Sequence, residues 1–123
     1  MSPRFRVALD RERFVPGNYV RGTVTVGTGG RSRSLEVSLQ YTEETEDYSA
    51  CAISLDTTSL HTGNLVTGQL FDFEVALPDD ALPNYSSRHG ELYWQIDVKS
   101  DQLGPDSHDR RRIDVRMPPP SAE

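Results

Sequence analysis

Cysteine is nearly absent from this sequence, since Cys51 is the only one among 123 residues. A single thiol cannot form a disulfide within the chain, so nothing here indicates an oxidising compartment. Hydrophobic residues are also scarce, at 35%. No apolar run approaches the roughly 18–20 residues that a transmembrane helix needs, and the N-terminal residues 1–6 lack the apolar segment of a secretory signal. We therefore expect a soluble, cytoplasmic protein without a transmembrane segment.

An excess of positive charge is missing too. The chain has 13 Lys and Arg residues against 19 Asp and Glu residues, which gives a formal net charge of −6 at pH 7. A long-range field of this sign repels nucleic acid and anionic membranes. Nucleic acid is therefore not an expected partner.

What the sequence does contain is hydrophobic alternation with a period of two. Each run places its apolar side chains on one face of a strand and its polar side chains on the other, which predicts half-buried strands. Parallel sheets are covered on both faces and read as continuous apolar runs, so the alternation favours antiparallel pairing. The runs are Phe5, Val7 and Leu9; Val20, Gly22, Val24 and Val26; Leu35, Val37, Leu39 and Tyr41; Cys51, Ile53 and Leu55; Phe71, Phe73, Val75 and Leu77; Leu92, Trp94, Ile96 and Val98; and Ile113, Val115 and Met117.

Clusters of Gly, Pro, Asn and Asp separate these runs, and no stretch has a convincing helical period. The pattern predicts an all-β fold, an antiparallel immunoglobulin-like sandwich of about seven or eight strands. We expect residues 1–117 to form a single domain. Residues 118–123, PPPSAE, cannot continue a β ladder and are expected to form a mobile tail.

Two stretches carry recognisable motifs. Residues 14–24 read FVPGNYVRGTV, and residues 71–96 contain FDFEVALP, ALPNY and GELYWQI in that order. In order and spacing these resemble the N-terminal sandwich domain of the arrestin family, and they are similar to the domain of bacterial sporulation-control proteins and of the retromer cargo-binding subunit. Asn18 and Asn84 depart from the Glu and Ser of the family pattern. Family members carry two such sandwiches in tandem, whereas this chain has room for one.

The resemblance implies a domain that binds protein partners. It also implies a role for Arg11 and Arg13, because basic residues just after the first strand help arrestins to read phosphorylated receptor tails. Arginine pairs bidentately with phosphate. Asp10 and Glu12 are interleaved with the two arginines, however, and favour ordinary salt bridges on an exposed turn.

Three positions have physical roles that do not depend on the family. The Pro16–Gly17 pair suits a tight chain reversal, because proline fixes φ and glycine allows a positive φ. Gly22 interrupts an inward-facing set, which indicates a bulge or a close backbone approach. Trp94 is large enough to anchor the centre of a sandwich core.

The histidines and acidic residues form no recognisable catalytic or metal-binding pattern. Ser86 and Ser87 near His89 lack the setting of a catalytic triad. The acidic and histidine residues Asp79, Asp80, Asp106, His108 and Asp109 match no zinc or calcium spacing and suit turns. We therefore predict a protein that is not an enzyme and that needs no metal or other cofactor.

An acidic run at Glu43, Glu44, Glu46 and Asp47 leaves two interpretations open. It forms a solvated hairpin tip, which is the usual role of a charge run, or it forms an acidic docking patch. Cys51, at an inward position of a weak strand, is interpreted as a small core residue.

We predict an adaptor or scaffold domain that binds an extended peptide at a sheet edge or docks through a sheet face. A homodimer is also expected, since a lone sandwich can pair with itself. The alternative is a small-ligand or carbohydrate-binding module that stacks ligands on Trp94, Tyr93 or Tyr85. Burial of Trp94 would favour the first function, and Tyr93, on the opposite face, is expected to be exposed.

Overall fold

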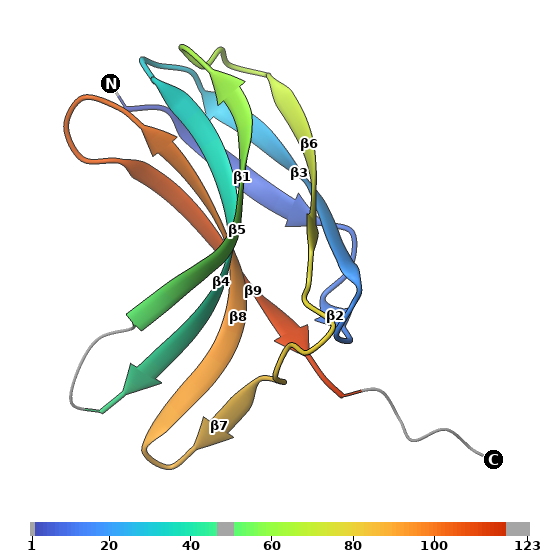
Figure 1. The fold of residues 1–123 in the computed structure, drawn as a ribbon. Helices are drawn as coiled ribbons and strands as arrows, with labels where there is room; N and C mark the ends of the chain where they lie inside the picture. Colours follow the sequence, from blue (N-terminus) through green and yellow to red (C-terminus); the bar gives the residue numbers. More distant parts are fainter. Residues whose placement is uncertain (1, 47–50, 118–123) are drawn as a thin grey trace.

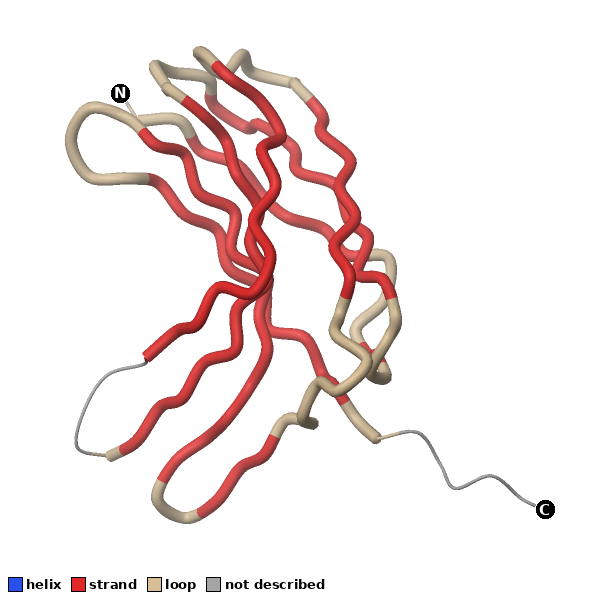
Figure 2. The backbone as a smooth tube through the Cα atoms, viewed as in Figure 1, coloured by secondary structure: helices blue, strands red, loops and turns tan. Residues whose placement is uncertain are grey.

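The computed structural model describes residues 2–46 and 51–117, with residues 51–53 described in the backbone only. The predicted tail at 118–123, the acidic Asp47 and the side chain of Cys51 lie outside the described residues. Within these ranges every regular element is a strand, and there is no helix (Figure 2). No described segment is therefore a helix long and apolar enough to cross a membrane.

The described residues form nine strands in two sheets, and Figure 1 shows how the sheets lie against each other. The smaller sheet has the order β1-β3-β6, and the larger has the order β2-β9-β8-β4-β5, with the short β7 also paired to β8. All pairs are antiparallel, as predicted, except the two-residue contact of β2 with β9, which is parallel. The strands are β1 (Arg4–Leu9), β2 (Arg13–Phe14), β3 (Tyr19–Thr28), β4 (Ser34–Thr45), β5 (Cys51–Thr62), β6 (Leu70–Ala76), β7 (Tyr85–Ser87), β8 (Gly90–Asp101) and β9 (Ser107–Val115).

The core lies between the two sheets and consists mostly of alternating residues that were predicted to face inward. Phe14, Leu65 and Ala81 join it from outside the predicted runs, and Met117, predicted to face inward, is 62% exposed. Trp94 is 2% exposed and Phe73 is 6% exposed, which confirms their predicted burial. Apolar burial of this kind is the main favourable term in folding. The other core residues are Val7, Phe14, Val20, Val24, Val26, Leu35, Val37, Leu39, Leu65, Val75, Leu77, Ala81, Ile96, Val98, Ile113 and Val115.

The central strand β8 departs from the prediction because it is buried on both faces. Tyr93, Gln95 and Asp97 point away from the core, yet they are only 8%, 9% and 4% exposed. The expectation that Tyr93 is exposed was wrong. The strands of the larger sheet bend near their middle (Figure 1), and the neighbouring side chains on this outer face line a pocket. Gln95 and Asp97 lie in this pocket, whereas the ring of Tyr93 is covered by the guanidinium of Arg112.

Strand β5 also departs from its predicted alternation. Leu39 lies opposite Asp56 and the next residue, Gln40, lies opposite Ser54, so Leu55 is the extra residue of a β-bulge. The bulge shifts the face on which the following side chains lie. Leu55, predicted to face inward, is 49% exposed as a result.

The two predicted backbone devices are present. Gly17 has φ of 88°, and the Asn18 N–H donates to the Val15 carbonyl at 3.1 Å, which closes the Pro16–Gly17 turn. Gly22 allows a close approach, because a Cβ there would lie 2.6 Å from the Ala8 carbonyl oxygen and 2.8 Å from Cζ of Phe73.

Candidate functional site

The larger sheet extends past the end of the smaller one, and this extension is the candidate interaction surface. We call it the arm and define it as Tyr41–Thr45 of β4, Gly90–Trp94 of β8 and Tyr85–Ser87 of β7. In Figure 1 these strand ends project beyond β1, β3 and β6. The inner face of the arm is therefore a continuation of the core-facing side of the sheet that the smaller sheet does not cover.

Trp94 marks the point where the core ends and the arm begins. Its indole Nε1 donates to the Leu82 carbonyl at 2.7 Å, and its ring lies 4.7 Å from the ring of Tyr41. Asn84 lies in the same β6–β7 loop as Leu82 and bonds it to two strands. Its Nδ2 donates to the Ile113 carbonyl of β9 at 2.7 Å, and its Oδ1 accepts from the Trp94 N–H of β8 at 3.3 Å. The departure of Asn84 from the family pattern thus has a structural role.

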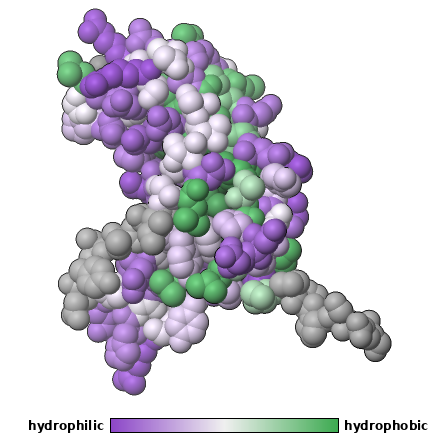
Figure 3. Space-filling view, in the orientation of Figure 1, coloured by the Kyte–Doolittle hydropathy of each residue, from purple (hydrophilic) through white to green (hydrophobic). Residues whose placement is uncertain are grey.

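Beyond Trp94 a cross-strand row on the inner face of the arm joins Glu43 to two largely apolar side chains, Leu92 and Tyr85. Glu43 of β4 lies opposite Leu92 of β8, and Leu92 lies opposite Tyr85 of β7. Tyr85 is 62% exposed, and Leu82 beside the arm is 61% exposed. Hydrophobic residues reach the visible surface around the junction of the arm and the sandwich (Figure 3). A pocket of ≈ 230 Å³ opens here, lined by Glu43, Glu44, Thr45, Tyr85, Ser87, His89, Gly90, Glu91 and Leu92.

Three glutamates, Glu43, Glu44 and Glu91, line this pocket, and a fourth, Glu46, contacts His89 of the lining. Three of these four have partners. Glu91 accepts from Nη1 of Arg112 at 2.7 Å. Glu44 accepts from the Tyr93 hydroxyl at 3.3 Å. Glu46 lies 3.9 Å from Nδ1 of His89. Among the described residues Glu43 has neither a hydrogen-bond partner nor an ion-pair partner, although it is the one on the apolar inner face.

Two hydroxyls on the same face of β4 are also without partners among the described residues. These are the buried oxygens of Tyr41 and Thr45, which flank Glu43 along the strand. Burial, and secondarily the charge of Glu43, raises the pKa of Tyr41. The inner face of the arm therefore combines apolar surface with one carboxylate and two hydroxyls that have no described partner.

The outer face of the larger sheet holds a second feature, the polar pocket of ≈ 520 Å³ in the bend of the sheet. Asp97 lies at its floor and accepts from Gln40 Nε2 at 3.3 Å, while Nδ1 of His108 lies 3.0 Å and Nε of Arg110 lies 3.5 Å from Oδ1. Gln95 in turn donates to Gln40 at 2.9 Å. This network satisfies the buried carboxylate by contacts within the sheet.

The predicted site residues do not come together. Arg11 is exposed, with its guanidinium 5.4 Å from the centroid of the Phe14 ring. Arg13 lies on β2 with its Nε 3.9 Å from Asp114, in an exposed ion pair. Tyr93 lies on the outer face of β8, where the guanidinium of Arg112 covers its ring at 3.7 Å. No described contact or pocket joins either arginine to Tyr93.

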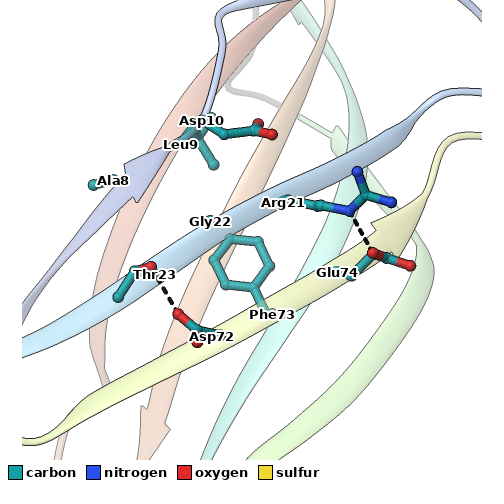
Figure 4. Close-up of a pocket in the computed structure, with 9 residues that line it drawn as sticks. All are labelled: Ala8, Leu9, Asp10, Arg21, Gly22, Thr23, Asp72, Phe73 and Glu74. Carbon is teal, nitrogen blue, oxygen red and sulfur yellow. Dashed lines mark hydrogen bonds and ion pairs between the residues drawn. The ribbon is translucent and has the colours of Figure 1, made fainter.

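A pocket of ≈ 630 Å³ on the smaller sheet has Leu9 and Phe73 in its lining, and its polar lining includes two pairs of side chains that bond across strands (Figure 4). Nε of Arg21 donates to Glu74 at 2.5 Å, and the Thr23 hydroxyl donates to Asp72 at 2.9 Å. The pairing with Glu74 raises the pKa of Arg21. These exposed pairs are ordinary cross-strand neighbours of a solvent face.

The histidines lie apart from one another. His61 has its ring 5.3 Å from the ring of Phe71, His108 is bound to Asp97, and His89 lies at the turn of the arm. Among the described residues no group of three or more His, Cys, Asp or Glu side chains is arranged to hold a metal ion.

Comparison with known proteins identifies the fold. No protein-family model and no curated protein sequence matches the chain. Among solved structures, the sporulation control protein Spo0M from Bacillus subtilis is similar, with a TM-score of 0.74 over 95% of this chain and 19% sequence identity. The fold is the predicted all-β, arrestin-like sandwich. The match covers 50% of the Spo0M chain, so this chain spans half of that protein's length.

Proposed function

We propose that the chain is a non-catalytic protein-interaction domain of arrestin-like type, a cytoplasmic adaptor or regulatory module that docks through the inner face of the arm. The observation that carries this proposal is the uncovered end of the larger sheet, where Tyr85 and Leu82 are more than half exposed. Exposed apolar surface rimmed by polar residues is typical of protein interfaces. The similarity to Spo0M, a sporulation control protein, supports a regulatory role.

A face suits this docking better than an edge. Two bulges interrupt the pairing of β5 with β4. One is at Leu55 and the other is at Leu60, which lies between the partners of Leu35 and Glu36. Bulges of this kind protect an edge strand from pairing with another chain. The edge of β1 is engaged at Val7, whose N–H donates to Asp109 at 2.7 Å and whose carbonyl accepts from Nε of Arg111 at 3.1 Å.

The alternative of a carbohydrate-binding module loses two of its three stacking residues. Trp94 and Tyr93 are buried, at 2% and 8% exposed. Only Tyr85 remains accessible, and it lies on the arm. A binding protein for sugars needs an exposed aromatic face together with hydrogen-bonding groups, so the protein-interaction function is the better supported of the two.

Affinity capture from the native lysate tests the proposal, with mass spectrometry of the wild type and two matched variants. Tyr85→Asp places a charge on the arm, whereas Leu103→Asp places the same charge on a residue that is 91% exposed in the β8–β9 loop. We expect a specific protein to be lost with Tyr85→Asp and kept with Leu103→Asp. Equal capture by all three chains would refute docking through the arm.

Charge reversal of Arg11 and Arg13 in the same assay tests the role that the arrestin resemblance implies for them. If these arginines read a phosphorylated partner, the reversal and phosphatase treatment of the lysate will remove the same protein. If the partner is still captured after both treatments, then its binding to the arm does not depend on phosphate recognition by Arg11 and Arg13.

A further inference from the structure

We propose that the arm pocket recognises a basic side chain, an arginine or lysine presented by an apolar segment of the partner protein, with Glu43 as the counter-charge. This inference rests on the proposed function and names the chemistry of the partner. It also chooses between the two interpretations of the acidic run, since it assigns Glu43 to a docking surface.

The shape of the pocket suits a long side chain with an apolar stem. Its volume of ≈ 230 Å³ is small, and its lining brings Leu92 and Tyr85 next to Glu43 in one cross-strand row. Arginine and lysine lay their methylene stems on apolar surface and keep the charged group at its edge. The exposed ring of Tyr85 can also attract a cation through its face.

The charge pattern selects the sign of the ligand. Arg112, the Tyr93 hydroxyl and His89 each contact one of the neighbouring glutamates, which leaves Glu43 as the carboxylate without a described partner. Glu43 itself is exposed, and a side chain that lies on the neighbouring Leu92 and Tyr85 excludes part of the solvent around the ion pair, which strengthens it. The net charge of −6 favours the approach of basic partners as well.

The hydroxyl of Thr45, which has no described partner, adds an acceptor at the same place. Thr45 lines the pocket, whereas Tyr41 lies on the same face two residues from Glu43 but outside the lining. A buried hydroxyl without a partner is costly, and a guanidinium or ammonium group that enters the pocket can donate to it. A multidentate cation therefore fits the site better than an apolar side chain alone.

The test is an NMR titration of the isotope-labelled chain with four blocked peptides. These are acetyl-Leu-X-Leu-amide with X as Arg, Lys, Gln or Glu, so that only the central side chain changes. We expect the Arg and Lys peptides to shift the amide signals of Glu43–Thr45, Gly90–Leu92 and Tyr85–Ser87. The Gln peptide should bind about fivefold more weakly, as expected for the loss of one partly shielded ion pair, and the Glu peptide more weakly still.

Three variants locate the effect. Glu43→Gln should reduce the affinity for the Arg peptide about fivefold, as the loss of the same pair requires, and Thr45→Val should reduce it without unfolding the chain. Glu36→Gln removes an equivalent charge from the outer face of the same strand and should have no effect. Added salt should weaken the binding of the Arg peptide but not that of the Gln peptide, because salt screens an ion pair.

Several results would overturn the inference. These are equal binding of the Arg and Gln peptides, shifts outside the arm, or an equal effect of Glu36→Gln and Glu43→Gln. If Tyr85→Asp abolishes protein capture while Glu43→Gln leaves it unchanged, the arm docks a partner but does not read a basic side chain. If sedimentation reveals a dimer that Arg88→Gln dissociates, a second copy occupies the pocket instead, since Arg88 is exposed in the β7–β8 turn.

Discussion

The substitution Gly22→Ala tests the packing of the smaller sheet most sharply. An added Cβ would lie 2.6 Å from the Ala8 carbonyl oxygen and 2.8 Å from Cζ of Phe73, both well inside ordinary contact. The phenyl ring can move, but the carbonyl belongs to the backbone of the paired strand β1 and cannot move without disturbing the ladder.

The magnitude follows from two opposing terms. Overpacking of a core costs about 1–3 kcal/mol, whereas replacing glycine with alanine restricts the unfolded chain and returns about 0.4–1 kcal/mol. The net loss is about 1–2 kcal/mol in the free energy of unfolding, which corresponds to a fall in Tm of about 4–8 °C for a domain of this size. Urea denaturation and calorimetry measure both quantities.

Gly27→Ala is the matched control, because Gly27 lies on the same strand and an added Cβ would meet its nearest atom at 3.8 Å. We expect that variant to be neutral or slightly stabilised. In the double variant with Phe73→Leu the ring contact is relieved and the carbonyl contact remains, so the cost of Gly22→Ala should shrink without vanishing. If Gly22→Ala and Gly27→Ala had equal stability, the close approach of β1, β3 and β6 would be refuted.

Three further variants probe other parts of the structure. Asn84→Ala removes the side-chain partner of the Trp94 N–H and of the Ile113 carbonyl, so the free energy of unfolding measured in urea should fall by about 2 kcal/mol. A fall below about 0.5 kcal/mol, as for an ordinary surface substitution, would contradict this role. Asp97→Ala removes the shared acceptor of the outer network and should destabilise the chain more than Asp97→Asn does; equal losses would count against the network. Because burial and then Glu43 raise the pKa of Tyr41, stability is unaffected below the unfolded value of about 10 and falls as the pH rises toward the folded pKa. Tyr41→Phe should reduce this alkaline loss, and an unchanged pH profile of unfolding would contradict the burial of the hydroxyl.

The core could be predicted from the sequence because period-two alternation reports directly which side chains share a face. It placed Trp94, Phe73 and Leu39 inward, and all three are buried. The same alternation continues through Glu43 and Thr45, which share the inward face but lie beyond the end of the smaller sheet. Alternation gives the side of a strand but not the extent of the opposing sheet, and that extent decides whether the inward side is core or surface.

Contacts between strands and a bulge explain the wrong predictions for Tyr93 and Leu55. Tyr93 is buried where the guanidinium of Arg112, on the neighbouring strand β9, covers its ring, and this contact depends on the pairing of β8 with β9 rather than on local sequence. Leu55 is exposed because one extra residue interrupts the pairing of β5 with β4. Neither feature can be predicted from the hydrophobic period of a single strand.

Only the acidic part of the candidate site could be predicted from the sequence. The acidic run containing Glu43 was identified, but its apolar neighbours Tyr85 and Leu92 come from strands about 40–50 residues further along the chain. Pairing between distant segments brings these groups together, so only the topology reveals them as one surface.

Site-specific photo-cross-linking shows whether the inner face of the arm contacts a protein partner. The chain carries p-benzoylphenylalanine in place of Tyr85 or, in a control, in place of Leu103, and each form is irradiated in the native lysate. We expect a discrete cross-linked protein from position 85 that position 103 does not give. No cross-link at position 85, or the same products from both positions, would contradict it.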